Sequence, residues 1–127
     1  MNSECSVNVP SVSQYREVDF CGVKSGANVD KAARCGFTVF HGVPKNAPKI
    51  EECPVNLECT VVHTIELDSH CLVPGRIVEA HVSEDCLPPD GKLDFMRVDR
   101  IAFLDNPARM YCAIGQMKAE AFRDGLE

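Results

Sequence analysis

Several classes of protein are disfavoured by what this 127-residue sequence lacks. It has no excess of basic residues, with 13 Lys and Arg against 19 Asp and Glu and a net charge of -6, so we expect no nucleic acid partner. No apolar run is long enough to cross a bilayer, and the first residues lack the basic and apolar regions of a signal peptide. We therefore expect one cytoplasmic domain over residues 1–127, without a membrane partner.

No Cys-x-x-Cys pair occurs, which argues against a zinc knuckle and a thioredoxin-like redox pair. In a reducing compartment the eight cysteines are expected as thiols, most of them packed as small buried hydrophobic groups. Disulfides are the alternative if the compartment is oxidising. The cysteines are Cys5, Cys21, Cys35, Cys53, Cys59, Cys71, Cys86 and Cys112.

Histidine spacing does not indicate a metal site either. His63 is expected on the inner face of a strand and His81 on the outer face of the next, so the sheet separates them, and His41 lies in a loop. Cys59 is interpreted as a core residue. Four carboxylates are interpreted as a solvated face, namely Glu51, Glu52, Glu58 and Glu66.

The first third of the chain predicts a strand and two short helices. Residues 5–9 alternate between apolar and polar up to Pro10, which is typical of a strand. Ser11 and Gln14 have the spacing of a capping box, which predicts a helix that ends near Gly22. Asn28 is the expected N-cap of a second helix over 29–35, and Gly36 its C-terminal stop.

The middle of the chain predicts a long antiparallel hairpin. Residues 37–40 form a plausible strand, and residues 55–67 alternate so that one face is apolar and expected to be buried while the other is expected to be wet. The chain turns at residues 68–70 and returns over residues 71–84. The apolar phase changes by one residue on the return strand, which predicts a β-bulge at Pro74-Gly75.

The last third gives weaker patterns. A turn is expected at residues 88–91 and a short strand ending near Phe103. Ile114, Met117, Ala121 and Phe122 recur with helical spacing, which predicts an amphipathic helix that ends at Gly125. The residue pattern as a whole indicates an α+β chain with an antiparallel hairpin at its centre.

Two positions could carry chemistry. The loop Ser25-Gly26-Ala27-Asn28 leads into a helix start that includes Lys31, so N–H groups and an ammonium could converge on an anion; alternatively, Asn28 only caps the helix and Lys31 is solvated. His70 at the hairpin tip could reach across a barrel mouth or be an ordinary turn histidine. The adjacent Asp68, Ser69 and His70 diverge, so they cannot form a nucleophilic triad, and the glycine spacing is not that of a nucleotide-binding loop.

From about Val7 to Phe122 the sequence resembles the flavin reductase-like family of FMN-binding split-barrel proteins, especially its flavoredoxin-type members. The most specific block is Cys53-Pro54-Val55-Asn56-Leu57-Glu58-Cys59. The other blocks are Val7 to Ser11, Val18 to Val23, Ser25-Gly26, Asp30-Lys31, Ala47-Pro48, Ile50 to Glu52, Ser69-His70, the bent strand around Gly75, and His81-Val82.

The resemblance implies a mainly β protein with short helices, folded as an antiparallel split β-barrel. It also implies a homodimer with FMN at or near the subunit interface and a reduced nicotinamide or a redox protein as electron donor. Lys31 and His70 match family residues that approach the isoalloxazine ring, and Phe103 an aromatic position beside it; Ser25 and Gly26 belong to the same cofactor-binding set. A fixed cation there would stabilise the reduced ring and raise its potential.

Residue 1 aligns with a point well inside the family's domain, so the expected fold is N-terminally truncated. A natural truncation, a fragment of a split gene and a remodelled member all fit this pattern. Ala27 stands where a basic residue is frequent, which weakens a phosphate site. The expected activity is NAD(P)H-linked flavin reduction or electron transfer, and the alternative is a cofactor-free dimerisation or interaction module.

Overall fold

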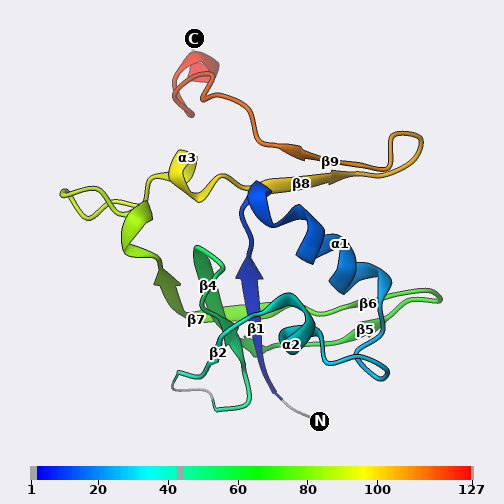
Figure 1. Ribbon diagram of the computed structural model, residues 1–127. Helices are drawn as coiled ribbons and strands as arrows, with labels where there is room; N and C mark the ends of the chain where they lie inside the picture. The colour runs from blue at the N-terminus through cyan, green and yellow to red at the C-terminus, as the bar shows by residue number, and fades with distance from the viewer. Residues whose placement is uncertain (1–2, 43–44, 127) are drawn as a thin grey trace.

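The computed structural model describes residues 3–42 and 45–126 and is mainly β with short helices. Its central sheet is antiparallel and has the order β1-β4-β7, so β4 is the middle strand (Figure 1). These three strands are β1 (Glu4–Val9), β4 (Val55–Val61) and β7 (Gly75–Val82).

Three small antiparallel pairs surround the central sheet. They are β2 (Val39–Phe40) with β3 (Lys49–Ile50), β5 (Ile65–Glu66) with β6 (Cys71–Leu72), and β8 (Ile101–Leu104) with β9 (Met110–Ala113). The helical segments are η1 (Val12–Gln14), α1 (Tyr15–Val23), α2 (Lys31–Cys35), η2 (Glu84–Cys86), α3 (Phe95–Val98) and η3 (Asp124–Leu126).

The N-terminal elements confirm most of the predictions for this region. The capping box is present, with the Ser11 N–H donating to Gln14 Oε1 at 2.9 Å, and the helix continues to Val23. The second helix starts later than expected, because Asp30 rather than Asn28 is its N-cap and accepts the Ala33 N–H at 3.1 Å. Gly36 ends the helix with φ 69°, a left-handed conformation that glycine adopts without steric cost.

The central hairpin is present, with its irregularity at a different residue. Regular pairing of β4 with β7 ends at Val61 and Gly75, one further bond joins the Val62 N–H to the Pro74 carbonyl at 2.9 Å, and the hairpin tip is the separate β5–β6 pair. The register shifts farther along, where Glu58 faces Glu79 and Cys59 faces Ile77, which leaves Val78 as the extra residue. The bulge prediction at Pro74-Gly75 was therefore wrong in position, because a proline carbonyl can still accept a ladder hydrogen bond.

The polar face of β4 is covered, against the prediction that it is wet. Asn56 is 4% exposed and Glu58 1% exposed, and β3 lies over them: Asn56 Nδ2 donates to the Ile50 carbonyl at 2.9 Å, and Asn8 Oδ1 accepts the Ile50 N–H at 3.1 Å. Polar groups tolerate burial here because they bond with one another and with the strand above them.

The opposite, apolar face of the central sheet is less covered than predicted. Val7 is 49% exposed and Ile77 58% exposed, while Cys59 is buried as expected. His63, expected to point inward, is exposed. The alternating pattern therefore assigned the side chains to the correct faces of the strand, but which face is covered depends on segments far away in the sequence.

The predicted C-terminal helix is wrong. Residues 114–120 have no regular structure, residues 121–123 form a turn, and η3 follows. The apolar residues of the expected helix do not pack against the rest of the protein, since Met117 is 67% exposed and Phe122 94% exposed. A short amphipathic helix is stable mainly through packing of its apolar stripe, and these residues lack that packing.

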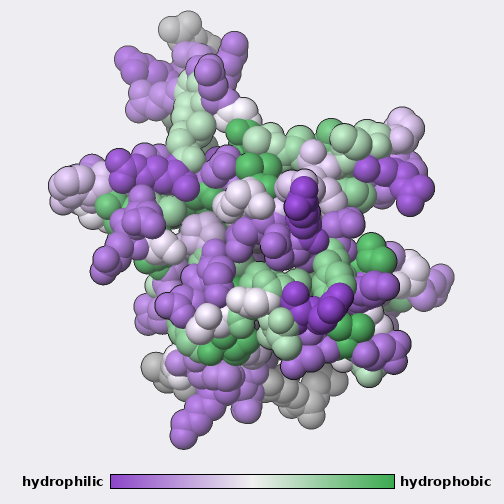
Figure 2. Space-filling view, viewed as in Figure 1, coloured by the Kyte–Doolittle hydropathy of each residue, from purple (hydrophilic) through white to green (hydrophobic). Residues whose placement is uncertain are grey.

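The β8–β9 hairpin lies beside α1 (Figure 1), and contacts join it and the residues just before it to α1 and to η1. The Val12 N–H donates to the Asp99 carbonyl at 2.7 Å, and Ser11 forms a β-bridge with Arg100. The Tyr111 hydroxyl donates to Asp19 at 3.1 Å. Figure 2 shows an apolar band along this hairpin, where Phe103, Leu104 and Met110 are exposed.

All eight cysteines are free thiols. The expectation that most of them are buried was wrong, because only Cys53, Cys59 and Cys86 are buried, whereas Cys71 is exposed and the other four are partly exposed. Within residues 3–42 and 45–126, none of the helices has the length and apolar character that a bilayer crossing requires.

Candidate functional site

The loop between α1 and α2 forms an open hollow. It is lined by Gly26, Ala27, Asn28, Val29, Asp30 and Lys31. Ser25 shapes this loop, because its hydroxyl accepts the Ala27 N–H at 3.2 Å and its carbonyl accepts the Asn28 N–H at 3.1 Å. Ser25 thus supports the loop through local bonds rather than by lining the hollow.

Lys31 places a cation in the wall of this hollow. Its Nζ donates to the Cys21 carbonyl at 2.7 Å, and it makes no ion pair with the described residues. A neutral acceptor leaves the full charge and two ammonium hydrogens available. Gly26 is next to it, since a Cβ at residue 26 would be 3.9 Å from Lys31 Cε. The Asp30 carboxylate on the same wall accepts the Ala33 N–H and limits the attraction for anions.

His70 and Phe103 belong to other parts of the molecule. His70 is exposed at the tip of the β5–β6 hairpin, where its Nδ1 and Ser69 Oγ are 2.7 Å apart. Phe103, on β8, is 55% exposed and packs against Tyr111 with ring centroids 5.4 Å apart. Among the contacts of the described residues, none joins Lys31, His70 and Phe103, and their convergence on one ring stays a prediction.

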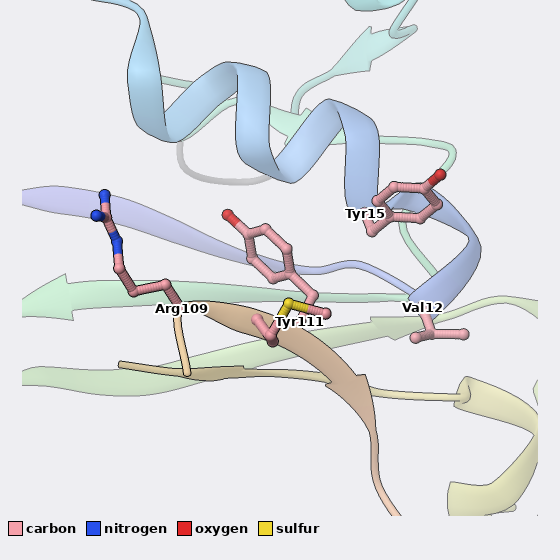
Figure 3. A pocket seen from close by; sticks show the side chains of 5 residues that line it. Val12, Tyr15, Arg109 and Tyr111 are labelled. Atoms are coloured by element: carbon pink, nitrogen blue, oxygen red, sulfur yellow. The ribbon is translucent and has the colours of Figure 1, made fainter. Parts of the chain in front are cut away.

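A second hollow, of about 340 Å³, lies between the start of α1 and β9 (Figure 3). Its lining is mostly apolar, and Figure 3 shows the Tyr111 ring between Arg109 and Tyr15. Burial and then the hydrogen bond to Asp19 raise the pKa of Tyr111. Sequence reasoning missed this hollow, because its two sides come from residues 12–15 and 109–111 and no local pattern connects them.

A polar cluster joins the buried Lys49 of β3 and the buried Glu58 of β4 to His81 of β7, whose side chain is partly exposed. Glu58 Oε1 accepts from Lys49 Nζ and is 3.0 Å from His81 Nε2, and the Lys49 ammonium is 5.1 Å from the Phe40 ring centroid. The hydrogen bond from Lys49 is the main cause that holds the pKa of Glu58 below its ordinary value, against burial, which raises it.

This polar cluster corrects the interpretation of Glu58 as a solvated carboxylate, because Glu58 is 1% exposed and bonded to Lys49 and His81. Lys49 has no exposed surface, and Glu58 Oε2 is buried without a partner among the described residues. The residue pattern gave no signal for it, because only the fold brings β3 over β4. The described residues contain no group of three or more His, Cys, Asp or Glu that could hold a metal.

The fold defines the class of the protein, since its strands and helices superpose on split-barrel proteins. The flavoredoxin of Desulfovibrio vulgaris (Miyazaki F) is 36% identical with a TM-score of 0.83, and the match covers 94% of this chain and 63% of that one. The flavoredoxin from Methanosarcina acetivorans is 37% identical with a TM-score of 0.84, covering 94% and 62%. The split-barrel prediction is thereby confirmed.

The family follows from the sequence itself. The model of the flavin reductase like domain matches residues 1–101, and the chain belongs to this family. An uncharacterized protein of Archaeoglobus fulgidus is 35% identical over 91 residues, which are 72% of this chain and 50% of that protein. The chain thus spans about half the length of the curated relatives it matches.

Proposed function

We propose that this chain is an FMN-binding flavoprotein that takes part in NAD(P)H-linked flavin reduction or electron transfer. The observation that supports this most directly is the Lys31 ammonium in an open hollow with a backbone carbonyl as its partner, in a chain of the flavin reductase-like family. An unneutralised cation beside an open surface suits a ligand that presents carbonyl or anionic oxygen.

The residues present fit such a group in two respects. Lys31 retains hydrogen-bond donors toward the hollow. Gly26 has no side chain, so the space beside the Lys31 side chain stays open. The exposed Phe103 ring can cover a planar apolar surface. The loop around Ser25 suits a phosphate less well, because the N–H groups of Ala27 and Asn28 already bond to Ser25.

Each side chain has a distinct part in this proposal. Bound flavin supplies a ring that accepts a hydride or single electrons. Lys31 holds a positive charge where negative charge accumulates on reduction, which raises the potential of the site. His70 keeps Nδ1 on Ser69, which leaves Nε2 as the ring nitrogen able to meet a ligand.

Partners and location belong to the same proposal. We propose a homodimer that covers part of the exposed apolar surface, and a reduced nicotinamide or a redox protein as electron donor. Two solved structures with the same fold are described as an FMN-binding protein from Thermus thermophilus, which supports FMN as the flavin through the fold alone. The cytoplasm is the proposed location.

One observation favours a second candidate function, a cofactor-free dimerisation or interaction module. The apolar face of the central sheet is open at Val7, Ile77 and Val78, each about half exposed. Exposed apolar surface of this kind marks interaction sites. A module that had lost its cofactor would keep this surface while Lys31 and His70 would have no ligand.

The experiment that separates the two candidates is cofactor analysis of the purified chain. A flavoprotein is yellow, releases flavin on denaturation, and the released flavin is identified as FMN by mass spectrometry. Apoprotein titrated with FMN should quench flavin fluorescence, and NADH and NADPH oxidation with added FMN tests the electron donor. A colourless preparation that leaves added FMN unbound favours the interaction module.

A further inference from the structure

Two cysteines face each other across the central sheet. Cys5 on β1 is the register partner of Cys59 on β4. The Val61 N–H donates to the Ser3 carbonyl at 2.7 Å, and because bonded pairs alternate along an antiparallel ladder, Cys5 and Cys59 form the next bonded pair. The Cα atoms of such a pair are about 5.5 Å apart, within the range of about 4.4–6.8 Å that a disulfide requires.

The two side chains also lean toward a common point above Gly75. A Cβ at residue 75 would be 3.2 Å from Cys59 Cβ and 3.8 Å from Cys5 Sγ. Cys5 therefore directs its sulfur across β4 toward β7, over the position from which the Cys59 side chain starts. Gly75 leaves the space above the pair free of a side chain.

The two thiols differ in their access to solvent. Cys5 is partly exposed, whereas Cys59 is 4% exposed. Burial, and then the neighbouring Cys5, raises the pKa of Cys59. An oxidant therefore meets Cys5 first, and Cys59 is placed to react with whatever forms there.

We propose that Cys5 and Cys59 are a redox-active dithiol that a low-molecular-weight disulfide oxidises to a cross-strand disulfide. The Cys5 thiolate attacks one sulfur of the small disulfide, which forms a mixed disulfide and releases one thiolate. The Cys59 thiolate then attacks Cys5 Sγ and releases the second thiolate. Two cysteine protons and two electrons leave the protein, and one small disulfide becomes two thiols.

The geometry favours a reversible bond over a permanent one. Facing Cβ atoms in an antiparallel pair are about 4.5–5.5 Å apart, whereas a disulfide requires about 3.5–4.5 Å. The strands must approach each other for the bond to close, and strained disulfides are the more easily reduced ones. Neither step involves the flavin, so this inference goes beyond the proposed function and is tested without a cofactor.

The test is oxidation of the full chain with oxidised glutathione. After incubation the protein is denatured in acid, alkylated with N-ethylmaleimide and weighed intact. We expect the main product to lose two of the eight alkylation sites, to carry no glutathione, and to regain both sites with dithiothreitol. In a tryptic digest of unreduced protein, the peptide of residues 1–16 should be joined to the peptide of residues 50–76 through Cys59, located by tandem mass spectrometry because Cys53 and Cys71 share that peptide.

Matched variants decide between this pair and the other cysteines. Cys71→Ser removes an exposed cysteine and should leave the cross-link intact, whereas Cys5→Ser and Cys59→Ser should each abolish it. Far-UV circular dichroism checks folding, and the wild-type digest decides the outcome if a variant unfolds. A glutathione adduct that never closes, a cross-link between other cysteines such as the interacting Cys21 and Cys35, or retention of all alkylation sites overturns the proposal.

Discussion

Gly42 lies directly against the buried carboxylate of Glu58. A Cβ at residue 42 would come within 1.9 Å of Glu58 Oε1 and 2.7 Å of Lys49 Nζ. Both side chains are already fixed, Glu58 by Lys49 and His81, and Lys49 by the Phe40 ring above it. Only glycine therefore fits at residue 42 without displacing the polar cluster.

Gly42→Ala should destabilise the protein, by about 1–3 kcal/mol, because the added methyl group overpacks a rigid site. The measurement is the midpoint and free energy of denaturant unfolding. Gly22→Ala is the matched control, since nothing lies within 4 Å of a Cβ there and the residue is inside α1. The control should gain up to about 1 kcal/mol from helix propensity. Equal effects in the two variants would contradict the packing described for residue 42.

Glu58→Gln should lower the thermal midpoint on the order of 10 °C, because it leaves the buried Lys49 ammonium without a counter-charge. The double variant Lys49→Met/Glu58→Gln should recover part of the loss, since it removes the unpaired charge as well. Glu120→Gln, in the exposed pair with Arg123, serves as control and should change the midpoint little. A double variant less stable than Glu58→Gln would show that the pair is not energetically coupled.

Stability should fall at alkaline pH through Cys53. Burial, followed by the charge of Glu52, raises the pKa of Cys53 to about 11, whereas an unfolded cysteine titrates near about 8.5. Between these two pH values Cys53 keeps its proton in the native state and loses it in the unfolded state. The free energy of unfolding therefore decreases as pH rises, by up to about 1.4 kcal/mol per pH unit from this residue.

Urea unfolding at a series of pH values measures this decrease in wild type and in Cys53→Ala. The variant should show a shallower alkaline decline, whereas Cys71→Ala, at an exposed position, should keep the wild-type slope. Parallel curves for wild type and Cys53→Ala would rule out Cys53 as the source.

Lys31→Ala should weaken FMN binding by roughly 10- to 100-fold, the value of a lost charge-assisted hydrogen bond. If flavin stays bound, its potential should become more negative, because the fixed cation is gone. Titration of apoprotein and redox potentiometry measure the two effects. Lys24→Ala, at an exposed lysine just after α1, is the control. Unchanged affinity and potential in Lys31→Ala would reject its assignment.

His70→Ala tests the second ring contact in the same way, with His63→Ala as its control because both histidines are exposed. We expect weaker flavin binding or a shifted potential for His70→Ala alone. Identical behaviour of the two histidine variants would mean that the hairpin tip does not meet the cofactor.

Local pattern was sufficient where neighbouring residues determine structure. The capping box at Ser11, the stop at Gly36 and the alternation of β4 follow from backbone geometry and side-chain size, and all three were predicted. The predicted helix from Ile114 to Gly125 does not form, because helical spacing alone does not provide a surface on which Met117 and Phe122 can pack. Local periodicity proposes an element, and distant packing decides whether it forms.

The same division holds for the site. The loop at Ser25 and Gly26 and the charge of Lys31 were accessible from sequence, and the structure brings Gly26 and Lys31 together. The polar cluster and the hollow at Tyr111 were not, because each joins segments that no periodic pattern relates. Buried carboxylates and solvated ones look alike in a sequence when the covering strand is remote.

The bond between Tyr111 and Asp19 spans 92 residues of sequence. During synthesis the ribosome releases α1, which carries Asp19, long before β9, which carries Tyr111. Asp19 therefore lacks its hydrogen-bond partner until the residues between them have emerged. A contact between residues so far apart in sequence forms only after a long loop has closed, which costs chain entropy. Such contacts slow the folding of a small domain. We therefore expect attachment of the β8–β9 hairpin to α1 to be a late step of folding.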